Sequence, residues 1–225
     1  MMQRHDWLWL QPAAWHGVLA QAAQAGADWP ELALWPQQAW PLVCARQTRP
    51  GVLSAGLSLP PAPDGGKRRL SLQLAPDALL RSSAPPLLSE LTRSPDAPPA
   101  LQHCAHRLHA WQLRVYGAHA WQWQTGLPYL HAGSDLDLLY YARSLDDLQA
   151  ALRRWHACAQ DCAQQGLRLD GEVILPDGAG LAWRECWQAM HSGGQVLLKR
   201  LHSVQLQDWG QVCAQLPRQD APCAA

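Results

Sequence analysis

The sequence predicts an α+β (mixed α/β) fold, in which a mixed sheet with packed helices follows a small N-terminal α+β module. The 225 residues are enough for one large or two small domains. Proline- and serine-rich segments at 82–86 and 94–99 interrupt the chain, and few helices or strands cross such segments. Strand-like and helix-like patterns then alternate towards the C-terminus. We therefore expect an N-terminal module over residues 1–93 and a second domain over residues 94–225.

The N-terminal module is expected to be α+β or mainly β. Its apolar runs are short and are separated by proline and glycine; they lie at 40–45, 51–59 and 68–75. In the last run, apolar and polar residues alternate over RLSLQL, which is typical of a strand with one buried face.

The second domain has longer and more regular patterns. Prolines open the segment 98–111 and no helix breaker follows them, which indicates a helix. The segment 144–166 has apolar residues at steps of three and four, with Ser144 as N-cap, Asp147 at the third position and Gly166 at the end. The remaining expected elements are strands at 112–117, 134–141 and 167–176, a short helix at 181–190, and one strand or a hairpin at 194–206.

Composition argues against several classes of protein. Lysine plus arginine equals aspartate plus glutamate at 18 each, and this zero net charge disfavours nucleic-acid binding through bulk charge. The seven cysteines include no CxxC pair, which favours reduced thiols over a disulfide framework or a zinc ribbon. No apolar run approaches membrane-spanning length. We therefore expect a soluble, cytoplasmic protein without a nucleic-acid or membrane partner.

Two aspartates interrupt the apolar segment AGSDLDLLYY, residues 132–141. Side chains alternate along a strand, so Asp135 and Asp137 should share one face while the leucines after them point into the core. Two neighbouring carboxylates repel each other unless a cation lies between them, and oxygen ligands alone favour Mg²⁺ or Mn²⁺. The alternative is that both aspartates cap turns after the preceding glycine and serine, since so short a motif often occurs by chance.

Two further patterns accompany this aspartate pair. VYGA at 115–118 indicates a strand that runs into a glycine turn, and RLDGEV carries Asp170 and Glu172 on one face of a later strand. This order resembles the nucleotidyltransferase superfamily of DNA polymerase β, in which a small turn positions a triphosphate and three carboxylates hold two divalent metals. Ala118 stands where that superfamily usually has serine, so one hydroxyl contact is missing. Asp170 is favoured over Glu172 as the third carboxylate because it lies nearer the strand start, and the choice stays open.

A narrower resemblance extends along most of the chain. It rests on the segments HDWLWL, VYGAHAWQWQTGLPYLHAGSDLDLL, LDGEVILPDGAGLAWREC and VLLKRL. Together they resemble the phosphoribosyl-dephospho-CoA transferases of malonate decarboxylase, also called holo-[acyl-carrier-protein] synthases, most strongly over 115–200 and weakly between 50 and 105. The family implies transfer of the prosthetic group from 2′-(5″-triphosphoribosyl)-3′-dephospho-CoA to a serine of the apo acyl carrier subunit. Pyrophosphate is released in this nucleotidyl transfer.

The resemblance also implies roles for individual residues. Asp135, Asp137 and Asp170 would hold Mg²⁺ or Mn²⁺, and Asp170 or Glu172 would complete the metal nearer the acceptor or take its proton. The groups expected to contact the triphosphate are the backbone N–H of Gly117 and Ala118, Ser134, Arg114, Arg184, and Lys199 or Arg200. For each of these cations taken singly, a solvated or ion-paired surface residue is the favoured alternative.

The N-terminal module is expected to bind the carrier protein or the dephospho-CoA arm. Carrier proteins are typically acidic, so Arg46, Lys67, Arg68 and Arg69 form the expected docking patch. Two other functions fit the same residues: a nucleotidyltransferase with another acceptor, such as a different carrier protein or a small molecule, and a non-catalytic binding protein with this fold. The retained acidic residues speak against the second.

Histidine and cysteine patterns offer a weaker alternative. His103, His106 and His109 recur every three residues, a spacing that turns them away from a shared face, so an exposed helix face is favoured over a zinc site. Cys158 and Cys162 lie on the apolar stripe of the long helix, where packing explains them. A GxSxG motif and a P-loop lysine are both missing, so a serine hydrolase and a P-loop enzyme are not supported.

Overall fold

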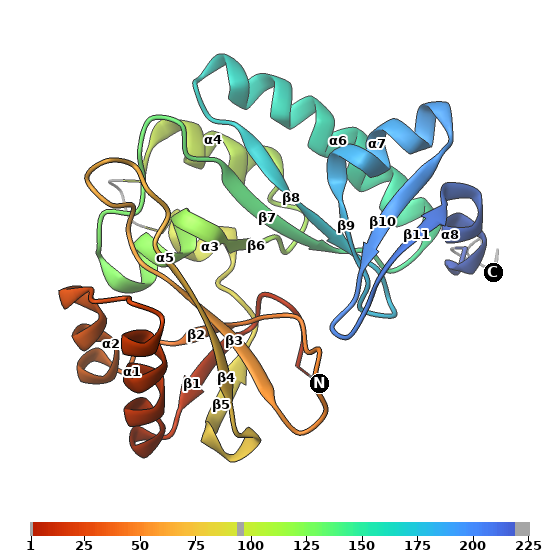
Figure 1. The fold of residues 1–225 in the computed structure, drawn as a ribbon. Helices are drawn as coiled ribbons and strands as arrows, with labels where there is room; N and C mark the ends of the chain where they lie inside the picture. The colour runs from red at the N-terminus through yellow and green to blue at the C-terminus, as the bar shows by residue number, and fades with distance from the viewer. Residues whose placement is uncertain (1, 94–96, 219–225) are drawn as a thin grey trace, which may run out of the picture. The chain divides into compact units, whose positions relative to one another are not determined.

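The computed structural model describes residues 2–93 and 97–218, and Figure 1 follows them from the red N-terminal end to the blue C-terminal end. The predicted α+β class is confirmed, because the described chain forms helices and two separate sheets. None of the described helices is long and apolar enough to cross a membrane.

Contacts divide the chain into two compact units. The first contains the residues up to Pro85 together with 119–131 and 201–203. The second contains 86–118, 132–200 and the residues from Val204 onward. The division of roles expected between residues 93 and 94 stays a prediction.

The first unit is built on an antiparallel sheet with the strand order β4-β3-β2-β1-β5. The strands are β1 (Trp7–Leu10), β2 (Leu42–Cys44), β3 (Leu53–Ser58), β4 (Arg69–Leu74) and β5 (Leu79–Ser83). Exposed and buried residues alternate along β4, as the RLSLQL pattern predicts. Helices α1 (Trp15–Gln24) and α2 (Leu34–Gln38) complete this unit, together with most of α5 (Gly117–Thr125).

Aromatic side chains form a large part of the core of the first unit. The ring of Trp121 stacks on Trp7 at 5.9 Å between centroids and on Tyr129 at 6.3 Å. Trp35 is fully buried, and its Nε1 donates to Pro41 O at 3.1 Å. Buried Trp and Tyr rings usually find a partner for their polar atom, and Tyr129 Oη donates to Ser58 O at 2.7 Å. Tryptophan thus supplies the bulk that a chain without phenylalanine lacks.

The second unit contains a six-stranded sheet in the order β11-β10-β9-β8-β7-β6. Its strands are β6 (Arg114–Tyr116), β7 (Leu136–Tyr141), β8 (Leu169–Ile174), β9 (Gly180–Ala182), β10 (Gln195–Lys199) and β11 (Val204–Asp208). Strands β7 and β8 are parallel, and every other neighbouring pair is antiparallel. The 194–206 segment therefore forms the hairpin of the two expected alternatives, while β9 was not predicted.

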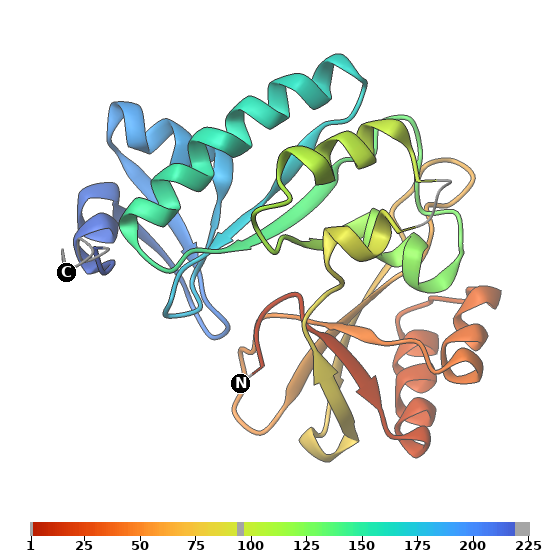
Figure 2. The same ribbon diagram turned by 180° about the vertical axis from the view of Figure 1, so that it is seen from behind.

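Helices of the second unit connect and cover these strands. They are α3 (Leu88–Leu91), α4 (Pro99–Arg107), α6 (Leu145–Gln164), α7 (Trp183–Ser192) and α8 (Trp209–Gln215). Helix α6 is the crossover between β7 and β8, and Ser144 caps it by accepting from Asp147 N at 3.1 Å, as predicted. Figures 1 and 2 show α4 and α6 side by side on one side of the sheet.

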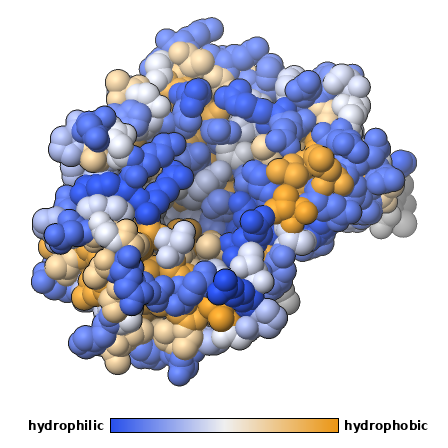
Figure 3. Space-filling view, viewed as in Figure 1, coloured by the Kyte–Doolittle hydropathy of each residue, from blue (hydrophilic) through white to orange (hydrophobic). Residues whose placement is uncertain are grey.

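The hairpin of β10 and β11 carries an apolar surface. Figure 3 shows it as an orange area over these two strands. Val204 and Leu206, on the outermost strand, are 41% and 59% exposed. These two side chains alternate with polar ones, so they lie on one face of the strand.

Candidate active site

The aspartate pair lies at the start of β7, and the strand sorts its side chains as predicted. Leu136 and Leu138 are fully buried, whereas Asp135 and Asp137 are half-buried. Tyr140 shares the leucine face, and its hydroxyl donates to Asp147 Oδ1 of α6 at 2.6 Å. The helices therefore cover the leucine face, and the two aspartates point to the opposite one.

Asp137 and Asp170 are neighbours on this opposite face. They are direct partners in the parallel register of β7 and β8, so their side chains leave the sheet on the same side. Asp170 Oδ1 accepts the backbone N–H of Gly171 at 2.8 Å. Gly171 has φ +140°, and a Cβ there would collide with the backbone of Leu138, so only glycine fits between Asp170 and Glu172. Strand pairing thus brings the carboxylates of Asp137 and Asp170 together.

The glycine turn lies directly against Asp137. Tyr116 of β6 pairs with Asp137, and α5 begins at the next residue, Gly117. Gly117 has φ +69°, and a Cβ at this position would overlap Asp137 Oδ2 and lie 3.0 Å from its Cγ. Both the backbone conformation and the space therefore require glycine. The structure brings together the VYGA turn and the aspartate pair that the sequence singled out.

Arg168 is the residue of this site that the sequence reading missed. Its guanidinium forms a two-pronged ion pair with both carboxylate oxygens of Asp135. This hydrogen bonding raises the pKa of Arg168, and the charges of Asp170 and Asp137 act in the same direction. Strand pairing places it there, because Leu136 pairs with Leu169 and Arg168 thus lies beside Asp135; the sequence showed only that Arg168 directly precedes the strand of Asp170.

The arrangement of the carboxylates sets what they can hold. Among the described residues, Asp135, Asp137 and Asp170 do not bring their oxygens within 4.8 Å of one another as a group of three. Asp137 and Asp170 nevertheless offer an oxygen-only donor set on adjacent strands, and this chemistry fits Mg²⁺ or Mn²⁺. Asp135 joins such a set only if its oxygens exchange Arg168 for the cation.

Glu172 has a different environment from Asp170. It is 5% exposed, and its Oε1 accepts from Lys199 Nζ of β10 at 3.0 Å. Lys199, which was expected at the triphosphate, forms this ion pair, and its contact with the triphosphate stays a prediction. Because an ammonium group already neutralises Glu172, Asp170 is the better of the two candidates for a third carboxylate.

The other candidate cations are distributed around the same sheet. Arg114 pairs with Leu139 in β6 and β7, which puts it on the face of Asp137. Arg184, at the start of α7, donates to Leu169 O at 2.7 Å. Arg200 forms an ion pair with Asp177 at 2.7 Å. Ser134 and Ala118 are half-buried, just before Asp135 and just after Gly117.

The basic patch of the first unit is smaller than expected. Arg46, Lys67 and Arg69 are exposed. Arg68 instead donates to both oxygens of Glu31 at 3.0 Å and to Pro60 O at 2.8 Å, and its side chain is 16% exposed. It therefore has a structural partner within its own unit.

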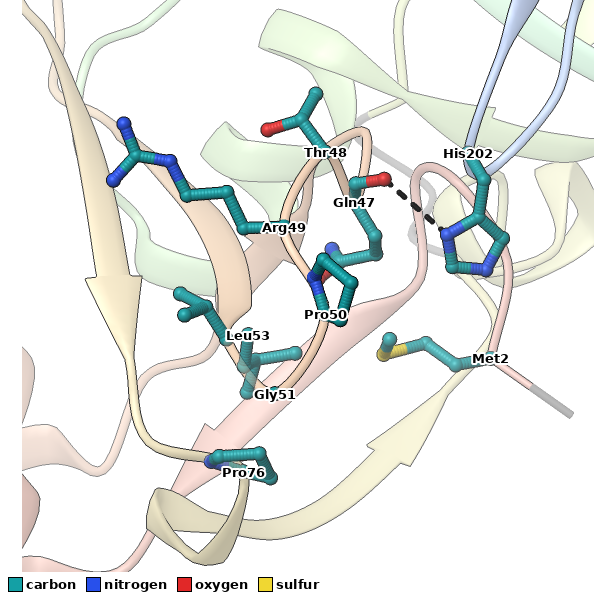
Figure 4. Close-up of a pocket in the computed structure, with 10 residues that line it drawn as sticks. Met2, Gln47, Thr48, Arg49, Pro50, Gly51, Leu53, Pro76 and His202 are labelled. Atoms are coloured by element: carbon teal, nitrogen blue, oxygen red, sulfur yellow. Dashed lines mark hydrogen bonds between the residues drawn. The ribbon is translucent and has the colours of Figure 1, made fainter.

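The first unit also contains a pocket of about 500 Å³ that the sequence did not indicate. Figure 4 shows the loop around Thr48, Arg49 and Pro50 on one side and His202 on the other. His202 Nδ1 lies 3.2 Å from Gln47 O, while Arg49 extends away from this contact. The residues that line the pocket are Met2, Gln47, Thr48, Arg49, Pro50, Gly51, Val52, Leu53, Pro76 and His202.

Fold and site together define an α+β protein with an oxygen-ligand site at the start of two parallel strands, beside a glycine turn. Sequence comparison then gives the family: the chain belongs to the phosphoribosyl-dephospho-CoA transferase MdcG family, whose N-terminal domain model matches residues 3–85 and whose C-terminal domain model matches residues 86–209. The narrower resemblance found in the sequence is thereby confirmed.

Three curated relatives match nearly the whole chain, and each is named phosphoribosyl-dephospho-CoA transferase. The protein of Xanthomonas euvesicatoria is 37% identical over 97% of this chain and 95% of its own length. That of Xanthomonas axonopodis pv. citri is 38% identical with the same coverage. That of Bradyrhizobium diazoefficiens is 34% identical over 91% of this chain and 89% of its own length. No solved structure matches the chain.

Proposed function

We propose that this chain transfers the phosphoribosyl-dephospho-CoA group from 2′-(5″-triphosphoribosyl)-3′-dephospho-CoA to a serine of the apo acyl carrier subunit of malonate decarboxylase, in the cytoplasm. The family and its named relatives support the transferred group. The observation that carries the chemistry is the pairing of Asp137 with Asp170 directly against Gly117. Carboxylates beside a glycine turn suit a triphosphate that arrives with divalent cations.

The proposed reaction is an in-line displacement at the phosphorus attached to the ribose. The carrier serine Oγ forms a new bond to that phosphorus, and the bond to the pyrophosphate oxygen breaks. Asp170 accepts the serine proton, because Glu172 is already paired with Lys199. The products are a phosphodiester on the carrier and free pyrophosphate.

The residues around the displacement have separate tasks. Asp137 and Asp170 would hold Mg²⁺ or Mn²⁺, and Asp135 would join them once the substrate phosphates draw Arg168 away. The bound cation would lower the pKa of the serine hydroxyl and neutralise the leaving pyrophosphate. The N–H groups of Gly117 and Ala118 donate to a phosphate oxygen, because the first N–H groups of a helix have no partner within it. Arg114 and Arg184 add positive charge at the rim.

The proposal is tested by weighing the carrier. The full chain is incubated with Mg²⁺, the triphosphate substrate and the apo carrier subunit, and the carrier is measured by intact-protein mass spectrometry. We expect a mass increase equal to one phosphoribosyl-dephospho-CoA group, and no increase without Mg²⁺ or with a carrier whose serine is replaced by alanine. An unchanged carrier mass with an authentic substrate pair would refute the proposal. Modification of a different carrier, but not of this one, would indicate another acceptor.

The partner proposal has its own test. We propose that Arg46, Lys67 and Arg69 contact the acidic carrier, whereas Arg68 contributes to folding through Glu31. The double reversal Lys67→Glu/Arg69→Glu should weaken carrier binding, and the loss should shrink at high salt. The control Arg81→Glu reverses an exposed charge on β5. Equal carrier affinity in both variants, measured by titration calorimetry, would exclude the patch.

A further inference from the structure

Three cysteines from two helices meet in the interior of the second unit. Cys104 lies on α4, and Cys158 and Cys162 lie one turn apart on α6. Their sulfur atoms all lie within 4.8 Å of one another, and all three residues are fully buried. Packing alone accounts for a pair of cysteines on an apolar stripe, but the third comes from a separate helix.

The sulfur geometry matches a tetrahedral metal site. Zinc–sulfur bonds of about 2.3 Å at tetrahedral angles put the sulfur atoms about 3.8 Å apart. The Sγ atoms of Cys158 and Cys162 are 3.8 Å apart. A disulfide between them is unfavourable, because residues four apart on a helix keep their Cβ atoms about 5–6 Å apart and a disulfide needs about 3.5–4.5 Å.

A fourth donor is carried by the residue before Cys104, although its ligand atom lies outside the 4.8 Å group that the three sulfur atoms form. His103 Nε2 is buried and has no hydrogen-bond partner among the described residues. A buried ring nitrogen without a partner is costly, and a metal ion would satisfy it.

We propose that Cys104, Cys158 and Cys162 bind one Zn²⁺ that links α4 to α6, and that the His103 side chain turns to supply Nε2 as the fourth ligand. The thiol protons pass to solvent when zinc binds, and no electron is transferred. Such a closed four-ligand site is structural, and it loads as the chain folds because solvent does not reach the sulfur atoms. The site is separate from the oxygen ligands on the opposite face of the sheet and does not depend on the proposed transfer reaction.

Metal content of the full chain tests the site. Protein produced in zinc-supplemented medium should carry about one zinc per chain by mass spectrometry of the element, as expected for a structural site. Cys104→Ala and Cys158→Ala should lose it, while Cys186→Ala, which removes an equally buried thiol on α7, should keep it. Zinc-free wild-type chain, or loss of zinc from all three variants alike, would overturn the proposal.

A spectroscopic measurement covers the case in which a cluster variant fails to fold. Co²⁺ added to the zinc-free wild-type chain during refolding should give the thiolate-to-cobalt charge-transfer band and the intense visible bands of tetrahedral coordination. His103→Ala should weaken the visible bands while the charge-transfer band remains. The absence of a charge-transfer band in the wild-type chain would exclude the thiolate ligands, and unchanged visible bands in His103→Ala would exclude the imidazole.

Discussion

Replacing Gly117 by alanine should separate the stability of the fold from the activity of the proposed site. The new Cβ would overlap Asp137 Oδ2 and come within 3.0 Å of Cγ, and φ is +69°. The left-handed conformation costs an alanine about 1–2 kcal/mol. Relieving the overlap costs little free energy, because the Asp137 carboxylate can rotate away. Stability should thus fall by about 1–2 kcal/mol, while a carboxylate displaced by about 1 Å should slow transfer roughly 100-fold.

Gly166 provides the matched control. It has φ +77° at the end of α6, and nothing lies within 4 Å of an added Cβ. Gly166→Ala should therefore lose as much stability in urea denaturation as Gly117→Ala, yet retain its transfer rate in the carrier mass assay. Equal transfer rates in the two variants would mean that the contact between Gly117 and Asp137 has no part in the reaction.

Three further perturbations follow from the ion pairs and thiols. Lys199→Met leaves the buried Glu172 carboxylate without its ammonium partner. The free energy of unfolding, measured in urea, should fall by about 3 kcal/mol. Adding Glu172→Gln should restore much of this loss, and strictly additive losses in the double variant would exclude the pairing. Arg168→Gln removes a competitor for the Asp135 oxygens, so half-maximal transfer should need less Mg²⁺. The free energy of unfolding should change by less than about 1 kcal/mol. An unchanged or higher Mg²⁺ requirement would contradict the proposed exchange of Arg168 for the cation. Burial raises the pKa of Cys44 from 9.0 to about 12. The contribution of the neutral thiol to the free energy of unfolding is therefore complete below pH 9 and is lost as the pH rises towards 12. A Cys44→Ala variant that loses as much stability at alkaline pH as the wild type would show that this thiol is not responsible.

Local pattern was enough to predict the direction of the aspartates and the main elements around them. Alternation along β7 separates the aspartates from the leucines whatever lies next to the strand. Ser144 caps α6 through a contact three residues along the chain, which the sequence displays directly. The 194–206 segment left two alternatives because a hairpin and a single strand share the same alternation, and pairing between β10 and β11 decided for the hairpin.

Contacts between distant segments were beyond the sequence reading. Arg168 reaches Asp135 only because β7 and β8 are parallel and in register, and Lys199 reaches Glu172 across the short strand β9. The assignment of residues 119–131 to the first unit likewise depends on tertiary packing, since the sequence between the turns on either side does not show which unit it packs against. The contact between Cys104 and the two cysteines of α6 was not predicted for the same reason, because it joins two separate helices.

The central claim is that Asp137, beside Gly117 and Asp170, takes part directly in the transfer. The most direct test compares single-turnover rates of carrier modification for Asp137→Asn and for Asp28→Asn, an equivalent change at an exposed loop residue of the first unit. The account predicts that Asp28→Asn modifies the carrier at the wild-type rate, while Asp137→Asn folds normally and leaves the carrier mass unchanged. A wild-type rate in Asp137→Asn would contradict it.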